Sequence, residues 1–337
     1  MPAAVYQGEH TISVETVPIP PVGPSQVLLQ VSHCGICGTD LHLMMDDWGT
    51  PGSIGGHEYS GVVAAIGSGA QGWAVGDRAV GGPGPGCGQC RLCRSGRTHL
   101  CSGAARGPAL SGAYAAYKVV DADGLFRVPA PLDLRAAALT EPVAVAYRGV
   151  QRAGARPGDR VLITGAGPIG LLTAAVLSVG GITDITVSEP NPKRRGLAEK
   201  VGAATTLTPD ELGRPATALD LVSNPYQFAF ECSGQPDAME GALANLDRAG
   251  TLVLSGTGMR RPRLEPNRVI VHELTVTGTV EYTQDDYHAA IGLLAEGRLP
   301  VDVLIEPEDL PLARLQWGME RLVAGELAGK VMVAPNA

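Results

Sequence analysis

The stretch from Cys34 to Glu58, CGICGTDLHLMMDDWGTPGSIGGHE, contains residues whose types and spacing suit the binding of a metal ion. Cys37 offers a thiolate, and His57 and Glu58 follow a glycine-rich turn. Zinc accepts a mixed set of sulfur, imidazole and carboxylate ligands, and a catalytic zinc uses three protein ligands and keeps a fourth position open. We therefore predict a catalytic zinc centre at Cys37, His57 and Glu58.

A second cysteine-rich segment, GCGQCRLCRSGRTHLC, lies farther along the chain at residues 86–101. Four thiolates from one short loop form a closed tetrahedral shell, which leaves no open position for chemistry. The alternative is a set of buried free thiols or disulfides, which a loop rich in glycine and poor in apolar residues does not favour. We predict a structural zinc bound by Cys87, Cys90, Cys93 and Cys101.

The segment RVLITGAGPIGLLTAAVLSVGG has the pattern of a strand, a glycine-rich turn and a helix. In a GxGxxG turn the first glycine permits a tight turn, the second lets a pyrophosphate approach, and the third allows the helix to pack closely. The phosphates then lie at the helix N-terminus, where free amides favour an anion. The predicted dinucleotide-binding residues are Gly165, Gly167, Pro168, Ile169 and Gly170.

The next apolar run, DITVSEP, ends at Glu189, which follows Gly170 by 19 residues. An acidic residue at this spacing hydrogen-bonds the hydroxyls of the adenosine ribose. Glu189 would also repel the extra phosphate of NADP, although Arg194 and Arg195 nearby could contact that phosphate. NAD is therefore the predicted cofactor, with NADP as the alternative.

The length and composition of the chain indicate a globular protein with two domains and a small-molecule ligand. The chain has 337 residues, of which 45% are hydrophobic and 18% are charged, and one core rarely organises so many residues. The net charge of −8 argues against a nucleic-acid partner. The sequence shows neither a leader pattern nor an apolar run long enough to span a membrane, so we expect a cytoplasmic protein.

Short alternating runs bounded by glycine and proline in the first part of the chain predict an antiparallel, barrel-like domain. Later apolar runs such as FAFECSG and TLVLSGTG alternate with helical patterns, which predicts a doubly wound parallel sheet. The fold class is therefore α/β with two domains. The expected boundaries are 1–145 for a catalytic domain, 146–282 for the dinucleotide domain, and 283–337 for a return to the first domain, which would close a cleft between them.

Six motifs together resemble the zinc-dependent medium-chain dehydrogenase family, the alcohol and polyol dehydrogenases that include sorbitol, butanediol and threonine dehydrogenases. The resemblance covers essentially the whole chain and implies a GroES-like catalytic domain followed by a Rossmann domain. The motifs are CGTDLH (37–42), GHEYSG (56–61), the four-cysteine segment, GDRAV (76–80), EPVAVA (141–146) and GAGPIG (165–170).

The same resemblance implies roles for four further residues. Glu141 occupies a ligand position of the family, and either Glu58 or Glu141 is then the carboxylate on the zinc. Asp40 resembles the carboxylate that orients the metal-bound imidazole, in keeping with the need to fix its tautomer. Thr39 resembles the hydroxyl that starts a proton relay, and His42 resembles its outer end.

Two groups of residues near these motifs remain. The loop before His57 contains three residues that could line the entrance to the substrate site: Asp46, Asp47 and Trp48. The two acids would suit a hydroxyl-rich substrate. The alternative is that they are solvated loop residues. Cys34 and Cys232 fall outside both predicted metal sites and are interpreted as small core residues.

We therefore expect an enzyme that transfers a hydride between an alcohol CH–OH group and NAD, with two zinc ions per chain. The substrate would be a secondary alcohol, diol, polyol or sugar-like compound, and the chain would form a homodimer or homotetramer, for which ELTVTGTV could supply a sheet edge. The alternatives are a zinc-free quinone or enone reductase of the same superfamily and a non-catalytic NAD-sensing protein.

Overall fold

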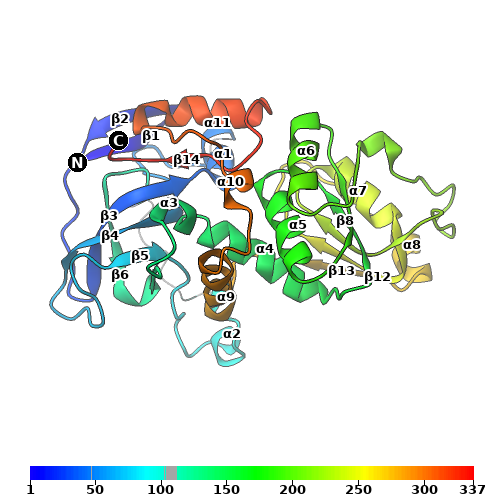
Figure 1. Ribbon diagram of the computed structural model, residues 1–337, viewed down its shortest axis with the longest axis horizontal. Coiled ribbons are helices and arrows are strands. Elements are labelled where there is room, and N and C mark those ends of the chain that lie inside the picture. Colours follow the sequence, from blue (N-terminus) through cyan, green and yellow to red (C-terminus); the bar gives the residue numbers. More distant parts are fainter. Residues whose placement is uncertain (47, 102, 104–111) are drawn as a thin grey trace. The chain divides into compact units, whose positions relative to one another are not determined.

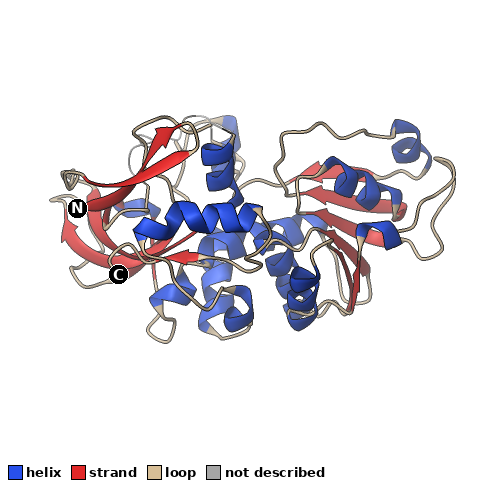
Figure 2. Ribbon diagram, turned by 90° about the horizontal axis from the view of Figure 1, so that it is seen from above, coloured by secondary structure: helices blue, strands red, loops and turns tan. Residues whose placement is uncertain are grey.

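The computed structural model describes residues 1–46, 48–101, 103 and 112–337, and its chain divides into two compact units. Unit 1 comprises Met1–Glu141, Tyr282–Gly297 and Ile305–Ala337, and unit 2 comprises Pro142–Glu281 and Arg298–Leu304. The C-terminal segment therefore contributes mainly to unit 1, while its short stretch Arg298–Leu304 belongs to unit 2. Both chain termini lie in unit 1, and they are near each other in both views (Figure 1, Figure 2).

Unit 1 contains two antiparallel sheets, in agreement with the short alternating runs of its sequence. A hairpin pairs β1 with β2, and the larger sheet has the order β14-β3-β4-β5-β7, with β6 also paired to β3. The strands are β1 (Pro2–Gly8), β2 (Thr11–Thr16), β3 (Gln26–Gly35), β4 (Glu58–Ile66), β5 (Arg78–Gly81), β6 (Tyr117–Asp121), β7 (Leu125–Arg127) and β14 (Met332–Val333).

Short helices and single helical turns connect these strands. The helices that lie wholly in unit 1 are α1 (Gly38–Met45), α2 (Arg91–Arg94), α3 (Leu134–Ala137), α9 (Gln284–Ala295) and α11 (Leu315–Val323), with 3₁₀ turns η1 (Thr98–Leu100), η2 (Ala122–Gly124) and η4 (Leu312–Arg314).

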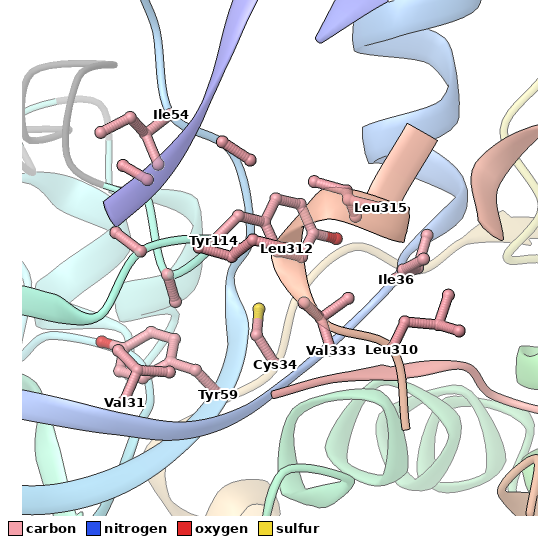
Figure 3. Packing of buried hydrophobic residues seen from close by; sticks show 14 of the residues in the cluster. Val31, Cys34, Ile36, Ile54, Tyr59, Tyr114, Leu310, Leu312, Leu315 and Val333 are labelled. Atoms are coloured by element: carbon pink, nitrogen blue, oxygen red, sulfur yellow. The ribbon is translucent and has the colours of Figure 1, made fainter. Parts of the chain in front are cut away.

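The core of unit 1 forms because alternate residues of its strands are apolar. On β3, Val27, Leu29 and Val31 are fully buried, as expected when every second side chain of a strand faces the core. Residues of the C-terminal segment, including Leu310 and Val333, join the same cluster (Figure 3). The C-terminal segment is therefore part of the core and not a peripheral tail.

Unit 2 contains one six-stranded parallel sheet in the order β10-β9-β8-β11-β12-β13. Counted from β8, this order is 3-2-1-4-5-6, that of a doubly wound dinucleotide-binding sheet. Val161, Leu162 and Ile163 of the inner strand β8 are all fully buried, because both faces of such a sheet are covered. The strands are β8 (Arg160–Thr164), β9 (Asp184–Ser188), β10 (Thr205–Leu207), β11 (Tyr226–Glu231), β12 (Leu246–Leu254) and β13 (Thr275–Gly278).

Helices α5 and α6 lie on one side of this sheet and α7 on the other (Figure 1), and helices flank the strands again in the view from above (Figure 2). The helices are α4 (Thr140–Ala153), which the boundary between the units crosses, α5 (Pro168–Val179), α6 (Pro192–Lys200), α7 (Pro236–Ala244), α8 (Pro266–Val271) and α10 (Val301–Leu304), with the 3₁₀ turn η3 (Pro209–Glu211). The predicted two-domain α/β fold class is confirmed. Among the described residues, no helix combines the length and the apolar character needed to cross a membrane.

Candidate functional site

The ligand atoms of Cys37, His57 and Glu58 all lie within 4.8 Å of one another in unit 1. Antiparallel pairing of β3 and β4 brings them together, because Gly35 at the end of β3 lies opposite Glu58 at the start of β4. A Cβ on Gly35 would stand 2.2 Å from Oε2 of Glu58, so any larger residue there would displace this carboxylate. Cys37 directly precedes α1, and its thiol therefore lies at the start of that helix.

Asp40 fixes the geometry around these three residues from the first turn of α1. Its Oδ2 accepts hydrogen bonds from the amide of Cys37 (3.0 Å) and from the hydroxyl of Tyr114 (2.7 Å), and its Oδ1 accepts one from the amide of Gly56 (3.3 Å). Oδ1 also lies 3.8 Å from Nδ1 of His57. Asp40 thus lies on the side of the imidazole where a carboxylate would orient it toward a metal.

Negative groups around His57 stabilise its protonated form when no cation is bound. Burial lowers the pKa of His57, but the charges of Asp40, Cys37 and Glu141 raise the pKa by more, so it lies well above its usual value. A metal ion must therefore displace a proton from this imidazole, and the same negative charge that holds the proton attracts a cation.

Lys330, from the C-terminal segment, is a member of this centre that the sequence did not reveal. Its side chain is 3% exposed, and Nζ donates to both carboxylate oxygens of Glu58 at 2.7 Å and to the carbonyl of Ile36 at 2.9 Å. Burial lowers the pKa of Lys330, but the charges of Glu58 and Cys37 outweigh that effect and hold it above its usual value. Glu58 is thus both a candidate metal ligand and the partner of a buried cation.

Glu141 lies in the first turn of α4, close enough to His57 and Glu58 for their charges to affect its ionisation. Burial raises the pKa of Glu141 to about 7, the charge of Glu58 acts in the same direction, and the charge of His57 and a hydrogen bond from Tyr282 oppose the rise. Among the described residues, Glu58 and not Glu141 completes the set of donors within 4.8 Å. Tyr282 is a second neighbour that the sequence did not reveal.

Thr39 and His42, the expected relay residues, both lie on α1. Thr39 is exposed, and its Oγ1 is 3.7 Å from Sγ of Cys37. His42 is three residues farther along α1, and its Nδ1 is 2.6 Å from Oδ2 of Asp46. Trp48 stacks on the ring of His42 with 5.2 Å between ring centroids and is 50% exposed. Asp47, expected at the same mouth, lies outside the described residues.

The four cysteines of the second predicted metal site also converge. Their sulfur atoms lie within 4.8 Å of one another, with 3.9 Å between the sulfurs of Cys87 and Cys93 and 4.0 Å between those of Cys90 and Cys101. Tetrahedral zinc with bonds of about 2.3 Å places its sulfur ligands about 3.8 Å apart. The spacing of the thiols therefore fits zinc without rearrangement of the loop.

Backbone amides prepare these thiols for a metal ion. Hydrogen bonds from backbone amides lower the pKa of Cys87, Cys90 and Cys101, whereas burial raises the pKa of Cys93 to about 11. Examples are the amide of Cys90, 3.4 Å from the sulfur of Cys87, and the amide of Cys93, 3.3 Å from the sulfur of Cys90. The amides stabilise thiolates, the form that binds a metal.

The remaining two cysteines lie apart from both groups. Cys34 is fully buried, and its sulfur points into the apolar cluster near Tyr114, Leu312 and Val333 (Figure 3). Burial raises the pKa of Cys232 to about 12. Cys34 is thus a small core residue, as the sequence indicated, whereas Cys232 is only half-buried, beside Thr173.

In unit 2, the glycine-rich turn lies between β8 and α5. Gly165 has φ +94°, and a Cβ there would stand 2.7 Å from the side chain of Ser233, while a Cβ on Gly170 would stand 1.9 Å from the carbonyl oxygen of Gly165. Gly167, in contrast, has open space where a Cβ would project, and Pro168 and Ile169 begin the helix. The turn therefore leaves room for a phosphate at the N-terminus of α5.

Glu189 follows β9 and is 4% exposed. Its Oε2 accepts a hydrogen bond from the amide of Ala166 (2.7 Å) and its Oε1 accepts one from the amide of Asn191 (2.9 Å). Each carboxylate oxygen retains a further lone pair for a ribose hydroxyl. Nε of Arg194 is buried, and the part of the chain that the structure describes offers it no partner.

Two family models match the chain. The alcohol dehydrogenase GroES-like domain matches residues 23–130, and the zinc-binding dehydrogenase model matches residues 168–296. The GroES-like model covers strands β3 to β7 and both groups of candidate metal-binding residues, and the second model covers the glycine-rich turn from Pro168 onward.

Individual proteins also resemble the chain over its full length. Sorbitol dehydrogenase of Bacillus subtilis is 32% identical over 351 residues, which cover 100% of this chain and 98% of that protein. L-threonine 3-dehydrogenase of Pyrococcus furiosus is 34% identical and covers 96% of this chain and 95% of that protein. A provisionally named zinc-binding dehydrogenase of Sinorhizobium meliloti, crystallised with NADP, has a TM-score of 0.87 and 31% identity, with 99% of each chain covered.

Proposed function

Since this chain belongs to the zinc-dependent medium-chain alcohol and polyol dehydrogenase family, we propose that it interconverts an alcohol CH–OH group and the corresponding carbonyl group of a secondary alcohol, diol, polyol or sugar-like compound. The chain is an NAD(P)-dependent, zinc-dependent alcohol oxidoreductase with a small-molecule substrate. The observation that carries the proposal is the convergence of Cys37, His57 and Glu58 within 4.8 Å. A quinone reductase that uses no zinc, or a protein that only senses NAD, has no use for such donors.

The residues of unit 1 hold the centre and orient it. Cys37 and His57, with Glu58 or Glu141, would hold the zinc, and Asp40 would keep the imidazole of His57 in place. Zinc bound there supplies a Lewis acid that lowers the pKa of a substrate hydroxyl group. The four cysteines from Cys87 to Cys101 would bind a second, structural zinc, which gives two per chain.

The chain's own hydroxyl and imidazole groups handle the proton that the alcohol loses. Thr39 lies next to the sulfur of Cys37 and would accept this proton while it releases its own hydroxyl proton along the relay. His42, paired with Asp46 at 2.6 Å, would then pass it toward solvent. The carboxylate of Asp46 stabilises the protonated imidazole during that transfer.

We further propose NAD as the preferred cofactor. Glu189 is held by the amides of Ala166 and Asn191, so its carboxylate lies beside the glycine-rich turn. This negative charge favours ribose hydroxyls over the extra phosphate of NADP, which Arg194 and Arg195 would have to neutralise. Glu189→Ala should weaken the binding of NAD more than that of NADP, and an unchanged ratio of the two dissociation constants would remove this argument.

Two properties of the whole protein complete the proposal. We propose a homodimer or homotetramer that associates through the edge strand β13, and a cytoplasmic location, since a four-thiolate metal site requires reduced cysteines. Fractionation of cells, with the protein followed by immunoblot, would test the location.

Metal analysis combined with kinetics tests the catalytic proposal. We expect about two zinc ions per chain and reduction of NAD with members of a panel of secondary alcohols, diols and polyols. Cys37→Ser should abolish turnover and leave NADH binding nearly intact, while Cys34→Ala, three residues away in the core, should retain activity. Full activity of Cys37→Ser would refute the assignment of the catalytic centre.

A further inference from the structure

Lys330 is a buried lysine that makes contact with the candidate metal-binding residues. All three hydrogens of its ammonium group have acceptors, because Nζ donates to Oε1 and Oε2 of Glu58 and to the carbonyl of Ile36. Glu58 itself is fully buried. Lys330 belongs to Ile305–Ala337, so the residue arrives from the end of the chain, 272 positions after Glu58.

Stability alone gives a weak reason for this arrangement. Two buried charges lose their hydration, and well-packed apolar residues in their place often give equal or greater stability. The pair is, moreover, beside Cys37 and His57, where Glu58 contributes a donor atom to the same group within 4.8 Å. The lysine therefore competes with any cation at this position for the same carboxylate.

We propose that Lys330 is a positioning residue that makes Glu58 a weak and exchangeable metal ligand. An ammonium group that holds both oxygens withdraws negative charge from the carboxylate and restrains its movement, while a lone pair on each oxygen stays available. Cys37 and His57 then remain the firm ligands, and a substrate oxygen can replace Glu58. This inference rests on the proposed zinc-dependent function and concerns the same centre.

The charges at the centre support the same role. Cys37 and Glu58 supply two negative charges when ionised, enough to neutralise a divalent cation. The ammonium of Lys330 offsets the further negative charge that Asp40 brings to the centre, which preserves the ability of the cation to attract the oxygen of an alcohol. Among the described residues, Lys330 is the cation that donates to Glu58. If Lys330 is removed, the metal is left to balance the charge of this carboxylate.

Cobalt-substituted protein provides a direct measurement, because its visible absorption spectrum reports the ligands of the metal. Imidazole serves as the probe for the exchangeable position, and the spectrum of Cys37→Ser is subtracted to remove the contribution of the four-cysteine site. In Lys330→Met, Glu58 should compete more strongly with imidazole for the metal. The affinity for imidazole should then be at least about tenfold lower than in the unchanged protein. Imidazole binding equal to that of the unchanged protein would overturn the proposal.

Matched variants separate positioning from a general effect of a lost lysine. Lys330→Arg keeps the charge and should restore imidazole binding. Lys118→Met removes another lysine of unit 1, which is half-buried and lies over the ring of Tyr59, and should leave the cobalt spectrum and imidazole binding unchanged. A loss of imidazole binding in Lys118→Met equal to that in Lys330→Met would contradict a specific role.

A double variant keeps the test valid if Lys330→Met does not fold. Since Lys330 acts through Glu58, Glu58→Gln and Glu58→Gln/Lys330→Met should bind imidazole equally well, and a tenfold difference between them would refute the proposal. Failure of the function itself has a different signature, because the unchanged protein would then show no cobalt absorption that depends on Cys37.

Discussion

At the scale of single residues, the candidate centre places several negatively charged groups around the imidazole of His57. Asp40, Glu58 and Glu141 all act on this region, and Lys330 is the cation that contacts Glu58. Such an excess is costly in a folded chain, because a buried carboxylate without a cation loses its hydration. A divalent metal ion relieves this cost, which is a physical reason for the centre to bind one.

The raised pKa of Glu141 predicts a pH-dependent stability of the zinc-depleted protein. Burial raises this pKa from 4.5 to about 7, so the folded chain binds a proton that the unfolded chain has lost between these values. The free energy of unfolding should therefore fall as the pH rises from about 4.5 to about 7, by at most about 3 kcal/mol, and then stay level.

Glu141→Gln removes this titration and provides the test. In thermal unfolding of zinc-depleted protein, the variant should gain stability relative to the original chain near pH 8 and lose that advantage toward about pH 5. A difference in melting temperature that does not change with pH would show that Glu141 is ionised throughout this range.

At the scale of structural elements, the strand pair β3 and β4 and the helix α1 position the candidate catalytic residues. The pairing of Gly35 with Glu58 places the carboxylate, and the start of α1 places Cys37, Thr39 and Asp40 within one turn. The four-cysteine segment is different, because α2 and η1 contain only four and three residues. A loop with so little regular structure depends on its metal for a fixed conformation.

Cys93→Ser should therefore lower the thermal stability of the protein. It should leave the candidate catalytic centre at Cys37, His57 and Glu58 intact. Loss of one thiolate opens the tetrahedral shell, and we expect about one zinc ion per chain in place of two and a melting temperature lower by several degrees. Cys232→Ser, which changes a cysteine outside both groups, is the matched control and should keep the zinc content. Unchanged zinc content in Cys93→Ser would mean that Cys93 is not needed to bind the second zinc.

At the scale of the whole molecule, each unit is assembled from segments that are distant in the chain. Residues 282–297 and 305–337 complete unit 1, and residues 298–304 complete unit 2. The sheet of unit 2 ends at β13, which pairs with β12 on one side. Val280, two residues after β13, is 56% exposed, and Ile270, in the helix α8 that precedes β13, is 72% exposed. Exposed apolar residues near an unpaired sheet edge are typical of an interface between subunits.

A charge near β13 should therefore weaken the association of subunits. For Val280→Glu we expect a smaller mass in multi-angle light scattering, because the carboxylate would lose its hydration in an apolar interface. Val323→Glu is the control, since Val323 of α11 is equally exposed at 56% but belongs to unit 1. An unchanged mass for Val280→Glu would argue against association through β13.

The sequence by itself determined the features that depend on residues close together in the chain. The four cysteines occupy one loop, and the turn from Gly165 to Gly170 lies between its own strand and helix, so spacing alone predicted both. The alternation of apolar residues likewise predicted an antiparallel and a parallel domain, which the structure contains. In these cases the physical requirement is local, and the local sequence meets it.

Only the tertiary structure decided which distant charges meet. Lys330 pairs with Glu58 across 272 positions, and Tyr282 hydrogen-bonds Glu141 across the whole of unit 2. A lysine in GKVMV and a tyrosine in VEYTQ have no local signal for such partners, because burial and pairing depend on which segments the fold brings together. The ligand types of the centre were thus predictable from sequence, whereas the charge that balances them was not.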